Sequence, residues 1–283
     1  MNELLKKIIK NITEKAENSI NETIGDYFDD EGLIICGKCH EKKTHKFISS
    51  AGQTYVVRCA CKCLKEKSEK EKALAKKKQN EKIIKALKEK AFYEKNFLNY
   101  TFSKDNTPNS KSSKIAKRYS EIFPKMLAEQ KGLVLFGPVG AGKTFLAACI
   151  ANAVMEQKYS CLFTTLFRLI NKINSTFDKK QREIDLINKF SLLLLDDFDT
   201  ERNTDYVNEA VYNIIEARYE SRKPMIITTN LEKEKFVDCY DIKKQRIYSR
   251  IVETCFFIQV EDNQRRIKIH LKAADDFKKE MGI

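Results

Sequence analysis

Short apolar segments alternate with longer amphipathic segments from residue 114 to the C-terminus. In the longer segments apolar residues recur every three or four positions, a spacing typical of helices with one buried face. The predicted helices cover residues 115–130, 143–156 and 205–219, and the predicted strands cover residues 133–136, 161–164, 191–195, 225–229 and 255–260. Strands separated by helices of this length pair in parallel, and helices cover both faces of such a sheet. The pattern therefore predicts an α/β fold for this part of the chain.

The first 24 residues carry apolar side chains at spacings of three and four, which predicts one helix that ends near Gly25. The residues of its apolar face are Leu4, Leu5, Ile8, Ile9, Ile12, Ala16, Ile20 and Ile24. The face either packs against its own domain or binds a partner protein. A small N-terminal module has little core of its own to cover the face, and both interpretations stay open.

Residues 62–90 contain 12 lysines and five glutamates but only a thin apolar stripe. This composition predicts an exposed helix or a flexible linker, whose charges either face solvent or contact phosphates. A loop is predicted at residues 106–113, which are rich in Asn, Ser and Pro. We therefore expect an N-terminal helix and metal-binding module in residues 1–66, a Lys/Glu-rich helical linker in residues 67–112, and the α/β domain in residues 113–283.

Composition adds two expectations about the surroundings of the protein. The formal net charge of +13 fits a nucleic acid or another polyanion as partner. The sequence has no apolar stretch long enough to span a membrane, and its N-terminus lacks the apolar region of a signal peptide. We therefore expect a cytoplasmic protein with no membrane contact. In that setting the nine cysteines indicate metal binding or buried thiols rather than disulfides.

Residues 137–144 match the phosphate-binding pattern G-x-x-x-x-G-K-[ST] at every specified position. The segment follows a predicted strand and precedes a predicted helix, so its backbone N–H groups and the helix N-terminus can surround an anion. Lys143 would reach the β- and γ-phosphates of a nucleoside triphosphate, and the Thr144 hydroxyl would bind Mg²⁺. We predict that ATP contacts Gly137, Pro138, Val139, Gly140, Ala141, Gly142, Lys143, Thr144 and Phe145.

Two acidic residues follow four leucines at the end of the third predicted strand. In a phosphate-loop protein Asp196 would hold the Mg²⁺, directly or through water, and Asp197 would orient or deprotonate the attacking water. Asn230 follows the next strand, and its side-chain amide can hold that water near the γ-phosphate. Each of these residues could instead serve only in a turn. Their order after a complete phosphate loop favours the catalytic interpretation.

Five cysteines within residues 36–63 predict a zinc site. The candidate ligands are Cys36, Cys39, Cys59, Cys61 and Cys63. The first two form a C-x₂-C pair, and the last three offer a second pair with one cysteine left over, while His40 or His45 could replace a sulfur. The alternative is buried reduced thiols, which rarely cluster so densely. A site with four protein ligands is closed to substrate, so Zn²⁺ bound here would be structural.

The ordered motifs from Phe97 to the C-terminus resemble those of AAA+ ATPases of the DnaC/IstB type, and within them the bacterial and phage helicase loaders. The matching segments are FGPVGAGKT (136–144), DDFDTE (196–201), YNIIEARY (212–219) and KPMIITTN (223–230). The phosphate loop alone is shared by many NTPases, whereas the ordered set is far more specific. The resemblance implies an AAA+ P-loop ATPase that uses ATP and Mg²⁺.

The same resemblance implies self-assembly, because in this family an arginine of one subunit reaches the γ-phosphate bound by the next. The segment 246–250 resembles that element, with Arg250 as the arginine finger and Arg246 as the alternative. Arg265 or Arg266 lies where a C-terminal sensor arginine is expected.

Two departures from the family pattern bear on the rate of hydrolysis. Asp199 stands where the family more often has Gly, and Asp197 stands where many AAA+ proteins have Glu. We therefore expect slow or partner-dependent hydrolysis.

Residues 166–189 are a candidate contact for single-stranded DNA, because this region contributes to such binding in related initiators and loaders. Its basic and aromatic residues are Arg168, Lys172, Lys179, Lys180, Arg182, Lys189, Phe167 and Phe177. The alternative is an amphipathic helix with a solvated basic face.

The motifs together favour an ATPase that loads the replicative helicase hexamer onto single-stranded DNA. Some loaders of this type grip the helicase with an N-terminal zinc module, whereas transposition helpers of the type generally lack one. ATP would govern a self-assembly that holds or opens the helicase ring, and hydrolysis would release it. The alternatives are an ATPase helper of a transposase (IstB type) and a nucleotide-switched, non-catalytic adaptor. The paired acids argue against the adaptor, because a pure binder needs no water-positioning groups.

Overall fold

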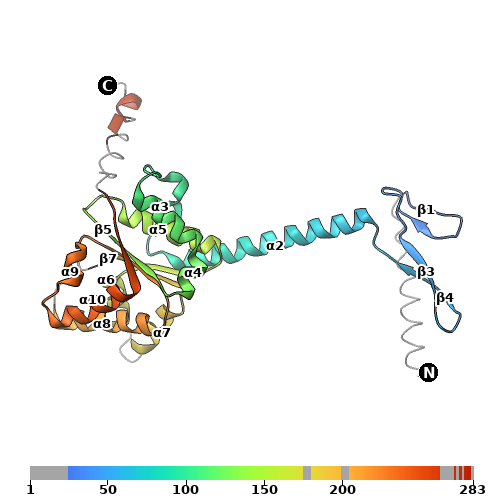
Figure 1. Cartoon of the computed structure of the whole chain (residues 1–283). Coiled ribbons are helices and arrows are strands. Elements are labelled where there is room, and N and C mark those ends of the chain that lie inside the picture. The colour runs from blue at the N-terminus through green and yellow to red at the C-terminus, as the bar shows by residue number, and fades with distance from the viewer. Residues whose placement is uncertain are drawn as a thin grey trace. The chain divides into compact units, whose positions relative to one another are not determined.

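The computed structural model describes residues 25–174, 180–198, 204–261, 271, 274–275 and 277–281. The helix predicted at residues 4–24 lies outside the described residues. The chain divides into two units, residues 1–79 and 80–283, each with its own internal contacts (Figure 1). The limits expected from the sequence, at residues 66 and 112, stay a prediction of functional domains.

The first unit contains two short antiparallel sheets between residue 27 and residue 58, in the metal-binding part of the predicted N-terminal module. Their strands are β1 (Tyr27–Phe28) paired with β2 (Ile34–Ile35), and β3 (Thr44–Ile48) paired with β4 (Thr54–Arg58). Gly52 adopts a φ of +76° in the β3–β4 turn, a conformation that favours glycine, and its N–H donates to Ser49 O. Leu33 and Ile35 are the aliphatic side chains that are buried among the described residues of this unit. So small an apolar core indicates that another interaction, such as a bound metal ion, stabilises this unit.

The Lys-rich segment is one long helix, α2 (Lys62–Ala91), so the structure selects the helical alternative. Ala91 is its one buried residue. Residues with good helix propensity, chiefly Lys, Glu and Ala, fill the helix. Most of their charges face solvent, and Lys88 near the end pairs with Glu156.

The second unit is built on a five-stranded parallel sheet, as predicted. The strands in their spatial order are β6 (Cys161–Thr165), β7 (Leu192–Phe198), β8 (Met225–Thr229), β5 (Gly132–Phe136) and β9 (Cys255–Gln259). Side chains alternate between the faces along each strand. Leu133 and Leu135 therefore enter one core cluster, and Val134 between them enters the other.

Helices cover both faces of this sheet (Figure 1). One face carries α3 (Lys111–Glu121), α4 (Phe123–Ala128) and α5 (Lys143–Glu156). The other face carries α6 (Leu166–Asn174), α7 (Lys180–Asn188), α8 (Asp205–Glu220), α9 (Lys233–Val237) and α10 (Ile242–Thr254). The helix predicted at residues 115–130 is divided into α3 and α4. Pro124 lies in the first turn of α4, where its missing N–H is tolerated.

The segment between α2 and α3, called the connecting segment here (residues 92–110), packs against the core of the second unit. It contains η1 (Lys95–Asn99) and η2 (Phe102–Lys104). The Phe97 ring stacks on Phe163 of β6 at 5.0 Å between centroids. Asn152 of α5 donates from Nδ2 to the carbonyls of Phe97 and Tyr100, both at 2.8 Å. The segment that follows the Lys-rich helix therefore belongs to the packed core.

Arg218 holds two connecting loops together from inside the second unit. It is 0% exposed, and its guanidinium donates to the carbonyls of Phe190, Ser191 and Pro224. These carbonyls flank the starts of β7 and β8, so the arginine ties the two central strands to α8. Burial lowers the pKa of this guanidinium to about 9.

Candidate functional site

The phosphate loop lies between β5 and α5, at the carboxyl edge of the sheet. Gly137, Gly140 and Gly142 have φ values of +142°, +85° and +106°, which residues with a Cβ rarely adopt. A Cβ on Gly137 would also lie 2.4 Å from Val260 O. The glycines therefore allow both the backbone conformation of the loop and its close approach to the residue that follows β9.

The side chain of Lys143 points back over this loop. It is 6% exposed, and its Nζ donates to Gly137 O (2.8 Å), Pro138 O (2.9 Å) and Asn230 Oδ1 (2.8 Å). Asn230 follows β8, the strand next to β5. Two residues that the sequence assigned to one site, 87 positions apart, are thus in direct contact.

The remaining loop residues have different surroundings. The Phe145 ring is buried and lies 5.2 Å from the Tyr100 ring of the connecting segment. Ala141 is buried, whereas Pro138 and Val139 are exposed at the tip of the loop.

Asp196 lies in β7 beneath the phosphate loop and is 2% exposed. Its Oδ1 accepts hydrogen bonds from the Thr144 hydroxyl (3.0 Å) and the Thr228 hydroxyl (2.6 Å). Its Oδ2 accepts one from the Tyr93 hydroxyl (3.1 Å). Burial raises the pKa of this carboxyl, and the hydrogen bond from Thr228 opposes the shift. The pair of Thr144 and Asp196 has the oxygen chemistry that Mg²⁺ prefers.

Asp197 occupies a distorted position next to Asp196. Its φ is +53°, and the pairing of β7 with β8 shifts register between Leu195 and Phe198. The Asp197 N–H donates to Thr228 Oγ1 (3.0 Å), and its side chain is exposed. Aspartate tolerates a positive φ better than most residues. The bulge turns the second acid toward solvent, and the first stays buried.

Thr228 and Tyr93 are site residues that sequence analysis missed. Thr228 is the residue before the last in β8, two positions before Asn230, and it bonds both to Asp196 and to the Asp197 backbone. Its place beside Asn230 in the sequence was an available signal. No pattern in the sequence marks Tyr93.

The proposed arginine finger is held within its own chain. Arg250 of α10 donates from Nε and Nη2 to the two carboxylate oxygens of Glu216 (2.9 and 3.1 Å), and it lies 4.3 Å above the Tyr219 ring. Arg246, one turn earlier, is exposed. Asp199, Arg265 and Arg266 lie outside the described residues.

Part of the candidate DNA surface has local partners. Arg168 lies 4.8 Å above the Tyr93 ring, and Lys172 pairs with Glu183 at 3.1 Å. Phe167 is 65% exposed on α6, so it is available for stacking rather than part of the core. Phe177 and Lys179 lie outside the described residues.

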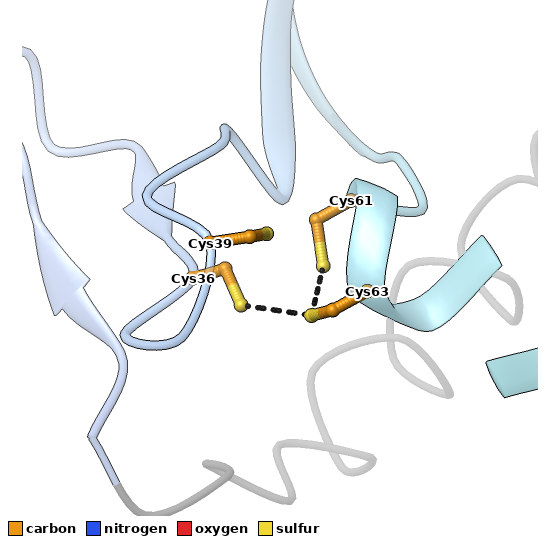
Figure 2. A group of neighbouring side chains, drawn as sticks. All are labelled: Cys36, Cys39, Cys61 and Cys63. Carbon is orange, nitrogen blue, oxygen red and sulfur yellow. Dashed lines mark hydrogen bonds between the residues drawn. The ribbon is translucent and has the colours of Figure 1, made fainter. Parts of the chain in front are cut away.

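Four of the five clustered cysteines meet at one point (Figure 2). Cys36 and Cys39 come from the turn after β2, and Cys61 and Cys63 come from the start of α2, with all four Sγ atoms within 4.8 Å of one another. Cys59 is the residue left over, because its Sγ faces the Lys42 carbonyl at 3.0 Å.

The donor set of this cysteine cluster fits zinc. Tetrahedral Zn²⁺ with Zn–S bonds of about 2.3 Å needs sulfur atoms about 3.8 Å apart, and the Cys63 Sγ lies 3.4 Å from those of Cys36 and Cys61. Backbone N–H groups of Cys39 and Lys38 lower the pKa of the Cys36 thiol to about 6, whereas the hydrogen bond to Cys36 raises the pKa of Cys63. A bound metal would replace the protons that these sulfur atoms share. The His40 ring contacts the Tyr27 hydroxyl instead, and His45 lies in β3. Cys149, Cys161 and Cys255 are buried in the two core clusters of the second unit.

Within the described residues, no helix is both long and apolar enough to cross a membrane.

Comparison with known proteins places this site in a family. A sequence model of the IstB-like ATP binding protein family matches residues 58–273. An insertion sequence ATP-binding protein (y4iQ/y4nD/y4sD) of Sinorhizobium fredii is 37% identical over 106 residues, which are 37% of this chain and 35% of that protein. The replicative helicase loader DnaI of Bacillus subtilis is 24% identical over 148 residues, 48% of each chain. The chain thus spans about half, or less, of the length of these relatives.

Solved structures support the same fold. The DnaC helicase loader has a TM-score of 0.52 at 24% identity, covering 59% of this chain and all of that one. DnaI has a TM-score of 0.51 at 24% identity, covering 60% of this chain and 96% of that one. The second unit therefore has the AAA+ P-loop fold, and the chain belongs to the family of IstB-like ATP-binding proteins.

Proposed function

We propose that this protein is an ATP-dependent loader that binds the replicative helicase hexamer and places it on single-stranded DNA. The observation that carries this proposal is the four-cysteine cluster in a chain that also carries a complete phosphate-loop site. Similarity to DnaI and DnaC supports the same role. A transposition helper needs an ATPase domain, but it has no evident use for a separate module held together by a metal ion.

The nucleotide site has a division of labour that suits ATP hydrolysis. Lys143 and the loop N–H groups would bind the phosphates, while Thr144 and Asp196 would hold Mg²⁺, which neutralises charge on the phosphates. Asp197 and Asn230 would orient the attacking water. The short and exposed Asp197 reaches less far than Glu would, so we expect slow turnover that partners or DNA stimulate.

The other parts have roles in the same scheme. The cysteine cluster would hold structural Zn²⁺ through Cys36, Cys39, Cys61 and Cys63. The module in residues 1–66 would grip the helicase, and α6 and α7 would contact single-stranded DNA through exposed groups such as Phe167. Arg250, or the exposed Arg246, would reach the nucleotide of a neighbouring subunit. A loader with these partners would work in the cytoplasm.

A second candidate is an ATPase helper of a transposase. It is favoured by the 37% identity to an insertion sequence ATP-binding protein, although this covers only 106 residues. A non-catalytic adaptor is a weaker candidate, because Asp197 and Asn230 would then have no substrate to act on.

Transfer of helicase onto a closed circle of single-stranded DNA tests the proposal. A closed circle has no free end, so a hexameric ring must open to encircle it. Helicase is incubated with the circle, ATP and the full-length protein, and helicase that stays with the DNA after gel filtration is measured. We expect retention with the wild type and loss with Lys143→Ala. Equal retention without the protein contradicts loading, and stimulation of the transposase of a neighbouring gene instead supports the second candidate.

A further inference from the structure

Tyr93 reaches the acid of the metal site from outside the motifs that build that site. It follows α2 by two positions, within the connecting segment. Its hydroxyl donates to Asp196 Oδ2 across a sequence separation of 103 residues. The other oxygen, Oδ1, faces Thr144 and Thr228. The two oxygens of this carboxylate are therefore held from different sides by different elements.

The Tyr93 ring is fixed in place by several independent contacts. The backbone N–H of Tyr93 donates to Phe163 O of the edge strand β6 at 3.3 Å. The preceding residue, Phe92, forms a parallel β-bridge with the same Phe163. The ring packs edge-to-face against Phe97 (5.1 Å) and Phe163 (5.9 Å), and Arg168 covers its face at 4.8 Å. The hydroxyl is thus positioned by packing, before any ligand binds.

We propose that Tyr93 is a positioning residue for the magnesium ion of this site, holding the outer oxygen of Asp196 so that the inner oxygen stays directed at Thr144 and the metal. The inference rests on the proposed ATPase function. A carboxylate can rotate about its last bond, and a donor on one oxygen restricts the direction of the other. Donors behind a metal-binding carboxylate commonly affect metal affinity about tenfold or more when they are removed.

Tyr93→Phe in the full-length protein isolates the hydroxyl, because the ring and its packing remain. Tyr119→Phe is the matched control: its buried hydroxyl donates to Lys131 O at 2.8 Å, away from Asp196. The half-saturating Mg²⁺ concentration for binding of a fluorescent ATP analogue is measured, together with the affinity for the same analogue in EDTA. Thermal unfolding of both variants is compared.

We expect Tyr93→Phe to raise the half-saturating Mg²⁺ concentration about tenfold and to leave the affinity in EDTA unchanged. Tyr119→Phe should change neither value. An unchanged Mg²⁺ requirement in Tyr93→Phe overturns the inference. So does a lower requirement, which would mean that the hydroxyl competes with the metal. Wild-type protein that binds the analogue with no dependence on Mg²⁺ would instead overturn the ATPase proposal on which the inference rests.

Discussion

The cysteine cluster permits a sharp comparison between two cysteines that are two positions apart. Cys61 contributes one of the four clustered sulfur atoms, whereas Cys59 faces the Lys42 carbonyl outside the cluster. Cys61→Ser should therefore remove the metal site, and Cys59→Ser should leave it intact. The two variants make the same chemical change in the same short segment.

The expected effect of Cys61→Ser is loss of the fold of the first unit. Among the described residues of this unit the buried aliphatic side chains are Leu33 and Ile35, and burial of two such side chains contributes about 3–6 kcal/mol. Structural zinc binding contributes about 10–16 kcal/mol in small domains. The metal would thus supply the larger part of the folding free energy. The second unit has its own core and should keep its unfolding transition.

Zinc per chain is measured by atomic absorption, and the order of the first unit is measured by limited proteolysis. We expect one zinc per chain in the wild type and in Cys59→Ser, and little zinc with rapid cleavage between residues 25 and 61 in Cys61→Ser. Equal zinc loss in both variants would refute the assignment of ligands. Wild-type protein that is purified without zinc and resists proteolysis would refute the structural role.

Three further predictions concern the second unit. Lys143→Ala should weaken ATP binding at least tenfold in a titration, because it removes the ammonium over the phosphate loop; unchanged affinity would contradict the site. Asp197→Asn should keep ATP binding and lower hydrolysis about 10²–10⁴-fold, so unchanged turnover would exclude Asp197 as the base. Arg218→Leu should lower the free energy of unfolding by about 3–5 kcal/mol in urea, because three carbonyls lose a charged donor; the exposed control Arg118→Leu should cost under about 0.5 kcal/mol.

The sheet and the phosphate loop could be predicted from the sequence because local patterns encode them. Each central strand is a short apolar run, and its alternate side chains enter two different cores. The glycines of the loop match positions with positive φ. Contact between Lys143 and Asn230 followed from a general rule, since the carboxyl ends of neighbouring parallel strands meet at one edge.

Other features depend on the way in which distant segments meet, and no local pattern records that. No sequence motif marks Tyr93, because its role depends on the pairing of the connecting segment with the edge strand β6. The surplus cysteine could not be identified by spacing, because both C-x-C and C-x₃-C pairs can bind zinc. The break at Ile122 could not be seen in the sequence, because apolar periodicity continues from α3 into α4. The ion pair of Arg250 with Glu216 could not be predicted either, because it joins two different helices.

Binding of the replicative helicase tests the central proposal most directly. Full-length protein, Cys59→Ser and Cys61→Ser are each mixed with the helicase of the source organism and an ATP analogue, and the mass of the eluting complex is measured by gel filtration with light scattering. We expect a complex with the wild type and with Cys59→Ser, and none with Cys61→Ser. Absence of any complex with the wild type, under every nucleotide condition, would contradict the loader proposal and direct the search to a transposase.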